Sequence, residues 1–127
     1  MTTFLLDSNI LMDFFKKRKE AVNLVQKLDE EGDLAVSILS VTELRAGWTE
    51  EQAKFFLPRL YKLVMIANLT QEIAELAGKF RQEYKLKGIT LPAIDTLIAA
   101  TAIVNYYQLV TRNKKDFPMP QIKFYSF

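Results

Sequence analysis

The sequence predicts one α/β domain, residues 1–127, built on a five-stranded, mainly parallel sheet flanked by helices. The first observation is an alternation along the chain. Short apolar runs of strand length are separated by longer stretches with apolar residues at helical spacing, as in repeated βαβ units. The second is continuity, because no linker, repeat or low-complexity segment divides the chain. The third is size, since 127 residues fall in the usual range of one domain.

The N-terminal third is predicted to form a strand, two helices and a second strand. Phe4-Leu5-Leu6 is a short apolar run that ends at Asp7-Ser8-Asn9, three residue types that favour helix starts. Apolar residues at helical spacing then predict a helix through Ile10 to Phe15 that meets the basic run 16–19, and another that stops near Gly32. The second strand is expected over 34–38.

Capping patterns mark the helices predicted farther along. Ser40 with Glu43, and Thr49 with Gln52, match the capping box that starts many helices, and Thr70 is a further expected cap. The remaining predicted elements are a strand over 63–66, a helix over 71–87 ended by Gly88, a helix over 93–105 with Pro92 in its first turn, and strands over 107–111 and 122–125.

The composition excludes several kinds of catalytic site. The chain contains no cysteine and no histidine, so thiolate nucleophiles, disulfides, zinc–thiolate sites and Ser-His-Asp arrangements are all excluded. Its 17 basic and 15 acidic residues give a net charge of +2, which permits an anionic partner without demanding one. Any catalysis must therefore rest on carboxylates, lysines, hydroxyls or a bound metal.

The chain carries no sign of export or membrane insertion. The first residues lack the basic segment and long apolar run of a signal peptide. The longest run dominated by apolar residues, 97–104, is far below the roughly 20 residues that span a bilayer. We therefore expect a cytoplasmic protein.

Four acidic residues occupy positions where a parallel sheet gathers ligands. Asp7 ends the first predicted strand, Glu43 lies in the first turn of the helix after the second, and Asp116 lies just beyond the fourth. Asp95 lies in the first turn of the helix that leads into that fourth strand. Ligands of open α/β sheets bind outside the carboxyl ends of the strands. All four acids are therefore expected to converge at one rim of the sheet.

Each of these acids also has an ordinary structural explanation. Glu43 completes a capping box, Asp95 suits the dipole of its helix, Asp7 is a possible cap and Asp116 a possible solvated loop residue. Asp95 carries an additional indication of function. Its helix is apolar nearly all round and therefore expected to be buried, and a carboxylate at the mouth of a buried helix needs a charged or hydrogen-bonded partner.

Convergence of carboxylates predicts a bound cation. Two carboxylates about 4 Å apart repel by roughly 4 kcal/mol at an effective dielectric constant near 20. With oxygen ligands only, a hard cation is the natural choice, and we expect Mg²⁺, with Mn²⁺ as a possible substitute. A site of this kind binds phosphate oxygens and activates water, so it fits phosphodiester hydrolysis best.

Around these acids the sequence resembles the PIN domain family, and in particular the VapC-type toxin ribonucleases of toxin–antitoxin pairs. The likeness runs essentially end to end, and all the motifs occur in order. The matching segments are Leu6-Asp-Ser-Asn-Ile-Leu-Met-Asp13, Ser40-Val-Thr-Glu-Leu-Arg-Ala-Gly47, Asp95-Thr-Leu-Ile-Ala-Ala-Thr-Ala102 and Thr111-Arg-Asn-Lys-Lys-Asp-Phe117.

The resemblance implies a fold, an activity and partners. It implies a five-stranded parallel sheet between helices, cleavage of RNA, and inhibition by a cognate antitoxin protein. Dimers are usual in this family, so a homodimer is expected. Asp7 and Asp95 would be the principal Mg²⁺ ligands, and Glu43 and Asp116 would complete the catalytic cluster. Asn113 would orient a carboxylate through a hydrogen bond.

Other residues near the motifs have less specific roles. Thr111 and Ser8 are expected to assist the carboxylates. Arg112, Lys114 and Lys115 share a loop with Asp116, and at least one of them is expected to position a phosphate, with Arg112 as one candidate. Two features of the first helix have ordinary explanations. The basic run 16–19 is expected to be a solvated helix end or an RNA backbone contact. Asp13 lies nearly opposite Asp7 around its helix, so it is expected at the surface.

An aromatic cluster is a possible partner surface. Trp48, Phe55, Phe56 and Leu57 gather around one short helical segment, where core packing is the default explanation. If that helix is partly exposed, the same surface could receive an amphipathic antitoxin helix. Arg45, nearby, is either a surface residue or a partner contact.

Two other functions remain open. One is a PIN-type nuclease of RNA processing, or one acting on DNA, without an antitoxin. The other is a non-catalytic RNA-binding module. A phosphatase or receiver domain that uses Asp7 is not supported, because the phosphatase would want a second acid at the position of Asn9 and the receiver a paired acidic cluster after the first strand.

Overall fold

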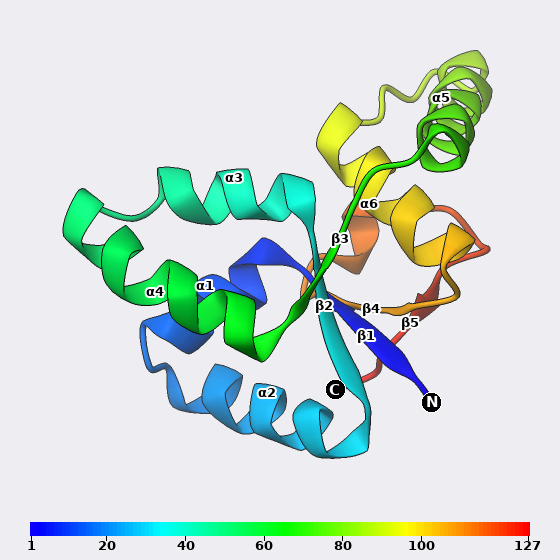
Figure 1. Cartoon of the computed structure of the whole chain (residues 1–127). Coiled ribbons are helices and arrows are strands. Elements are labelled where there is room, and N and C mark those ends of the chain that lie inside the picture. Colours follow the sequence, from blue (N-terminus) through cyan, green and yellow to red (C-terminus); the bar gives the residue numbers. More distant parts are fainter.

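The computed structural model describes the whole chain, residues 1–127, as five strands and six α-helices, with a pair of helices between each two successive strands up to β4 (Figure 1). All five predicted strands are present. The elements in chain order are β1 (Thr3–Leu6), α1 (Ser8–Phe15), α2 (Lys19–Glu31), β2 (Asp33–Ser37), α3 (Ile38–Ala46), α4 (Glu50–Leu63), β3 (Met65–Ala67), α5 (Gln71–Leu86), α6 (Ala93–Val104), β4 (Gln108–Val110), a 3₁₀ turn (Lys114–Asp116) and β5 (Lys123–Phe124).

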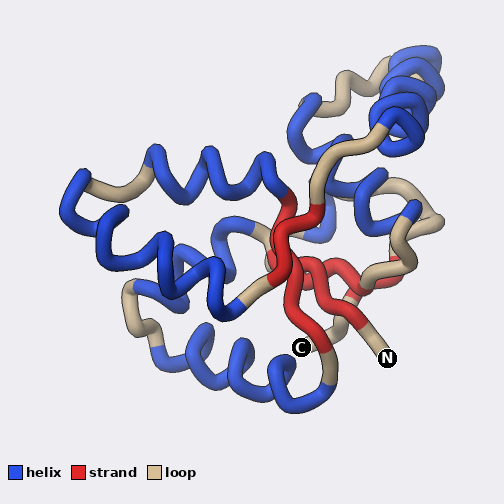
Figure 2. The backbone as a smooth tube through the Cα atoms, viewed as in Figure 1, coloured by secondary structure: helices blue, strands red, loops and turns tan.

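The strands form one parallel sheet in the order β3-β2-β1-β4-β5, which lies at the centre of the molecule (Figure 2). The chain builds outward from β1 to β3 on one side and then returns to place β4 on the other side of β1. Leu6 pairs with Val110, so these two strands end at the same level. The boundary between β1 and β4 is therefore the topological switch point of the sheet. Parallel α/β sheets bind ligands at the carboxyl ends of the strands on either side of such a point.

Helices cover both faces of the sheet, as Figure 1 shows. The side chains of β1 alternate, so Phe4 and Leu6 enter a core built with α1 to α4, whereas Leu5 enters a core built with α5 and α6. This alternation follows from the two-residue period of a strand. Helix α5 packs mainly on α6, where Ile73 and Ala77 meet Ala100. The result is a three-layer α/β domain.

The start of α3 corrects one sequence prediction. Ser40 was expected to cap this helix, but the cap is Ser37, whose hydroxyl accepts a hydrogen bond from the Leu39 N–H at 3.2 Å. The helix follows β2 without a loop, so a residue at the strand end takes the cap position. Ser40 is instead inside the helix, where its hydroxyl is buried without a hydrogen-bond partner. The capping-box explanation of Glu43 is therefore wrong.

The caps predicted at Thr49 and Thr70 are confirmed. Thr49 and Gln52 form a reciprocal capping box at α4, and the Thr70 hydroxyl caps α5. Gly88 follows the end of α5 with a φ of +80°, a conformation that glycine adopts without strain. Pro92 is the N-cap of α6 and not a first-turn residue, because the helix begins at Ala93. None of the helices combines the length and the apolar character that a transmembrane segment requires.

Candidate carboxylate site

Asp7 occupies the switch point between β1 and β4. It is the N-cap of α1, and its Oδ1 accepts a hydrogen bond from the Ser8 N–H at 2.8 Å. Its other carboxylate oxygen accepts from the Thr111 hydroxyl at 2.9 Å, and its own backbone N–H donates to the Val110 carbonyl oxygen at 3.0 Å. With 9% of its surface exposed, Asp7 is a buried carboxylate held by the ends of two adjacent strands.

Thr111 orients Asp7, a role that the sequence assigned chiefly to Asn113. Thr111 is 1% exposed, and its hydroxyl also accepts a hydrogen bond from the backbone N–H of Asn113 at 3.0 Å. The side chain of Asn113 makes no hydrogen bond in the structure. Asn113 therefore acts on the carboxylate indirectly, by fixing Thr111 through its main chain. Ser8, the other expected helper, contributes its backbone N–H.

The three other acids come from separate elements. Asp95 lies in the first turn of α6 and is half-buried, as expected for the mouth of a helix with six buried residues. Glu43 is an exposed residue of α3, and Asp116 is an exposed residue of the 3₁₀ turn after β4. Asp116 was expected in an irregular loop, and the turn is a small refinement of that expectation.

The acids affect each other's protonation. Burial raises the pKa of the Asp95 carboxyl, and the charges of Asp7, Asp116 and Glu43 raise it further. Burial also raises the pKa of Asp7; the hydrogen bonds from Thr111 and Ser8 lower it, and the charge of Asp116 raises it again. The charges of all three other acids therefore reach Asp95.

The carboxylate oxygens of these acids suit a hard cation that keeps several of its waters. No three acidic side chains lie close enough together to form a ready-made cage. Mg²⁺ does not need such a cage, because it commonly keeps several waters and binds through one or two carboxylates. Burial and mutual repulsion make the ionised form of Asp7 and Asp95 costly, and a cation between them would relieve that cost. The chemistry of these residues therefore suits Mg²⁺ or Mn²⁺.

Asp13 and Arg112 form an ion pair that sequence reasoning missed. Asp13 was expected at the surface and Arg112 at a phosphate, yet the Arg112 guanidinium donates to the Asp13 carboxylate, which also lies 3.2 Å from Arg18. The first pair is separated by 99 residues. No local pattern could have indicated it, because only the alignment of β4 beside β1 brings the two residues together.

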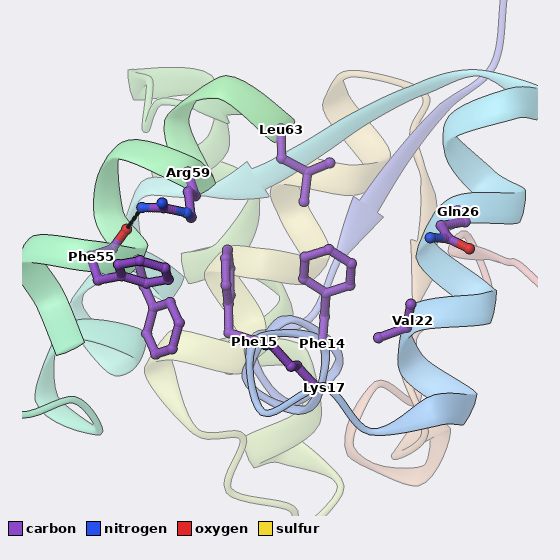
Figure 3. Close-up of a pocket in the computed structure, with 9 residues that line it drawn as sticks. Phe14, Phe15, Lys17, Val22, Gln26, Phe55, Arg59 and Leu63 are labelled. Atoms are coloured by element: carbon purple, nitrogen blue, oxygen red, sulfur yellow. Dashed lines mark hydrogen bonds between the residues drawn. The ribbon is translucent and has the colours of Figure 1, made fainter.

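An apolar hollow of about 520 Å³ lies away from the four acids (Figure 3). Figure 3 shows side chains from α1, α2 and α4 around it. The lining residues are Phe14, Phe15, Lys17, Val22, Gln26, Phe55, Phe56, Arg59 and Leu63.

The aromatic cluster predicted from the sequence divides between this hollow and the core. Trp48 is buried and packs edge-to-face on Phe15, whereas Phe55 is 53% exposed. Leu57 lines a different hollow, between α3 and α4.

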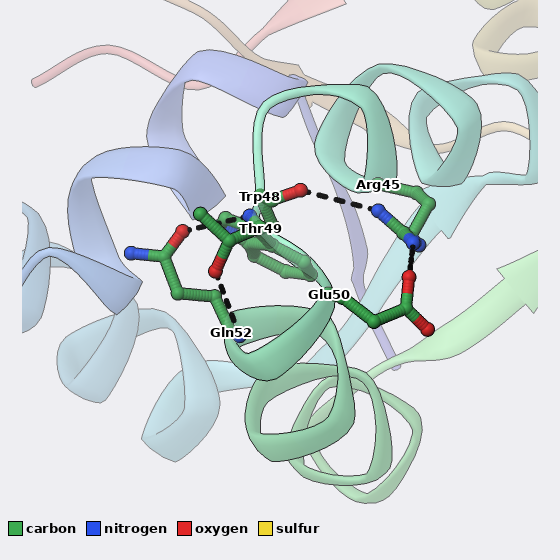
Figure 4. A network of polar contacts seen from close by, with 5 residues as sticks. All are labelled: Arg45, Trp48, Thr49, Glu50 and Gln52. Carbon is green, nitrogen blue, oxygen red and sulfur yellow. Dashed lines mark hydrogen bonds and ion pairs between the residues drawn. The ribbon is translucent and has the colours of Figure 1, made fainter.

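Arg45 stabilises the corner between α3 and α4 (Figure 4). Its guanidinium donates to the Trp48 carbonyl oxygen at 3.1 Å and to Glu50 at 2.6 Å. The Thr49–Gln52 capping box lies in the same corner. The structure therefore gives Arg45 an intramolecular role, which the sequence had left undecided.

Fold and site together define an α/β protein with a buried aspartate at the switch point of a parallel sheet and further acids within electrostatic range of it. The sequence model of the PIN domain family matches residues 4–122 of this chain. The chain belongs to the PIN domain family, and the curated relatives that it matches include proteins named ribonuclease VapC, as the sequence motifs predicted.

Two curated relatives illustrate the likeness. Ribonuclease VapC1 of Methanocaldococcus jannaschii is 34% identical over 89% of this chain and 77% of its own length. Ribonuclease VapC19 of Mycobacterium tuberculosis is 33% identical over 91% of this chain and 92% of its own length.

Solved structures show the same fold. VapBC2 from Rickettsia felis, bound to a promoter DNA fragment, matches with a TM-score of 0.87 and 25% identity over 99% of both chains. A toxin–antitoxin complex from Klebsiella pneumoniae matches with a TM-score of 0.75 and 33% identity, over 97% of this chain and 98% of that one.

Proposed function

We propose that the chain is a Mg²⁺-dependent endoribonuclease and the toxin of a toxin–antitoxin pair. The observation that carries the proposal is the set of four carboxylates around the switch point, with Asp95 responding to the charges of Asp7, Glu43 and Asp116. The names of its relatives, ribonucleases of the VapC type, support the activity and the substrate class.

In this proposal each residue of the site has a defined task. Asp7 and Asp95 hold the cation, which when bound supplies a centre that binds phosphate oxygens and activates water. Thr111 and the Ser8 N–H keep both oxygens of Asp7 in fixed positions. Glu43 and Asp116 are exposed, so they are the members that can orient water and accept its proton.

Cations beside the site would offset the repulsion between these acids and the RNA backbone. Lys114 and Lys115 are exposed and directly precede Asp116 in the 3₁₀ turn. Contacts of this kind position the phosphate chain and carry no sequence information. We therefore assign phosphate contact to these lysines.

Cleavage of a mixed RNA pool tests the proposed activity. The purified chain is incubated with Mg²⁺, with Mn²⁺ and with EDTA, next to Asp7→Asn and a control variant, Asp29→Asn, whose acid lies on the exposed side of α2. We expect cleavage by wild type and control only with a divalent cation, and a loss of at least about a hundredfold in Asp7→Asn. Equal RNA survival with wild type and Asp7→Asn would refute the nuclease proposal.

The apolar hollow between α1, α2 and α4 is the proposed antitoxin site. Its lining is mostly apolar and includes Phe55, which is half exposed, while its charged members, Lys17 and Arg59, are both cations. The Arg59 guanidinium lies 3.4 Å from the centre of the Phe55 ring. This chemistry suits an amphipathic helix with an apolar stripe and acidic flanks.

Co-purification tests the antitoxin proposal. The product of the neighbouring open reading frame is co-expressed with the chain, with Phe55→Glu, and with Tyr61→Glu as a control at another exposed aromatic of α4. We expect Phe55→Glu alone to lose the complex, because it places a carboxylate in an apolar contact. Failure of the neighbouring product to bind wild type would favour a PIN-type nuclease without an antitoxin.

A further inference from the structure

A carboxylate outside the cluster joins two segments that carry site residues. Asp13, in the second turn of α1, accepts a hydrogen bond from the Arg112 guanidinium, and its other oxygen lies 3.2 Å from Nε of Arg18. The Asp13 side chain is 22% exposed, against 38% for Arg112 and 63% for Arg18. Asp13 is therefore the most shielded member of a three-residue charge network.

Arg112 belongs to the segment 111–116, which also contains Thr111 and Asp116. Two side-chain contacts tie this segment to α1 and its cap: the Thr111 hydroxyl to Asp7 at 2.9 Å, and Arg112 to Asp13. Beyond the segment, Phe117 is 3% exposed in the core on the other face of the sheet. The location of exposed Asp116 relative to Asp7 therefore depends on a short stretch between these anchors.

The size of the interaction indicates what kind of role it has. A solvent-exposed ion pair contributes little to stability, too little to decide whether this domain folds. Catalytic geometry is far more sensitive, because a displacement of about 1 Å can lower a rate about a hundredfold. An interaction too weak to hold the fold together can therefore still set the position of a reacting group.

We propose that Asp13 and Arg112 are positioning residues of the nuclease site. Their ion pair holds the segment 111–116 against α1 and thereby sets Asp116 relative to Asp7. The inference rests on the proposed nuclease function and makes Arg112 a loop anchor, not a phosphate contact. Its guanidinium is already engaged by Asp13, whereas Lys114 and Lys115 of the same segment form no ion pair in the structure.

NMR tests the anchoring without any need for nuclease activity. Backbone amide spectra and ¹⁵N relaxation are recorded for wild type, Asp13→Asn, and the control Glu50→Gln, which breaks the exposed pair with Arg45. We expect Asp13→Asn to shift the amides of 111–117 and to increase their fast motion, with a melting temperature within a few degrees of wild type. Unchanged amides of 111–117 in Asp13→Asn would overturn the proposal even if the chain cleaves RNA.

A double-mutant cycle tests the consequence for catalysis. The rate of RNA cleavage is measured for Asp13→Asn, Arg112→Gln and the double variant, with Glu50→Gln as the control. We expect each single variant to lower kcat about tenfold with KM nearly unchanged, and the double variant to be no slower than the worse single variant. Arg112→Lys, which keeps a cation for Asp13, should retain most of kcat.

Two results of the cycle would contradict the positioning role. Losses that multiply in the double variant would mean that the two residues act independently. A raised KM in Arg112→Gln, with Asp13→Asn unaffected, would mean that Arg112 contacts the RNA phosphates directly. If wild type itself fails to cleave RNA, the nuclease proposal falls, and the NMR comparison alone decides whether the ion pair anchors the segment.

Discussion

At the scale of single residues, Asp7 and Asp95 lie at helix starts in addition to their proposed chemical role. Asp7 caps α1, and hydrogen bonds from Ser8 and Thr111 stabilise its charge, yet its burial still raises its pKa. Asp95 occupies a favourable position in the helix dipole of α6, yet burial and three neighbouring acids raise its pKa as well. In both residues the local interactions favour the charge and the surroundings oppose it.

The raised pKa of Asp95 predicts a pH dependence of stability. A carboxyl whose pKa is higher in the folded than in the unfolded chain holds its proton more tightly when folded. Its contribution to the free energy of unfolding therefore falls as the pH rises from the ordinary value of 3.8 through the raised one. An asparagine side chain cannot ionise, so we expect Asp95→Asn to gain stability relative to wild type across that window.

Melting curves in EDTA between pH 3 and pH 7 check this expectation. The quantity compared is the melting temperature of Asp95→Asn minus that of wild type, because the titration of all other groups largely cancels in the difference. The loss of the helix-dipole interaction offsets the gain by about 0.3–1 kcal/mol, so the trend with pH is the informative result. A difference that stays constant or shrinks with rising pH contradicts the prediction.

At the scale of elements, strand ends and helix starts share residues. Ser37 is the last residue of β2 and the cap of α3, Asp7 links β1 to α1 in the same way, and neither connection has a further loop residue. Such tight connections fix the first turn of each helix relative to the sheet. They also explain why Ser40, which matches the capping motif, lies inside α3 with a buried hydroxyl.

Two serine substitutions in α3 separate the true cap from the apparent one. Ser37→Ala removes the acceptor for the Leu39 N–H and is expected to cost about 1 kcal/mol of unfolding free energy. Ser40→Ala removes a buried hydroxyl without a partner and is expected to be neutral or stabilising. Urea denaturation of both variants gives the two values, and a larger loss in Ser40→Ala would restore the capping-box interpretation.

At the scale of the whole molecule, the topology creates the site. Because β1 lies at the centre of the sheet and β4 returns beside it, Asp7 and Thr111 meet although they are 104 residues apart. Helix α3 approaches from one face of the sheet and α6 from the other, and each contributes an acid to the same region. The cost of gathering these charges falls on the folded state only, so a cation bound there should stabilise the fold.

Magnesium is therefore expected to raise the melting temperature of the wild-type chain. A ligand that binds only the folded state at about 100 times its Kd adds about 2.7 kcal/mol, which corresponds to several degrees for a domain of this size. Differential scanning fluorimetry with about 10 mM Mg²⁺, against Na⁺ at matched ionic strength, measures the shift. The shift should be smaller in Asp95→Asn, and equal shifts in the two proteins would argue against a cation at Asp95.

The sequence by itself determined the α/β class, the approximate place of every strand, and the four acidic positions. These depend on hydrophobic periodicity, on turn and capping residues, and on motifs, all of which are local properties of the chain. Element boundaries were less well determined. The strand expected over 63–66 lies at Met65–Ala67, because α4 extends through Leu63.

Only the tertiary structure decided which distant residues act together. Thr111 as the partner of Asp7, Asp13 as the partner of Arg112, and the division of Trp48 and Phe55 between core and surface all depend on how helices and strands pack. The physical reason is one of range. Local conformational preferences are readable along the chain, whereas burial and charge pairing arise between segments about 100 residues apart.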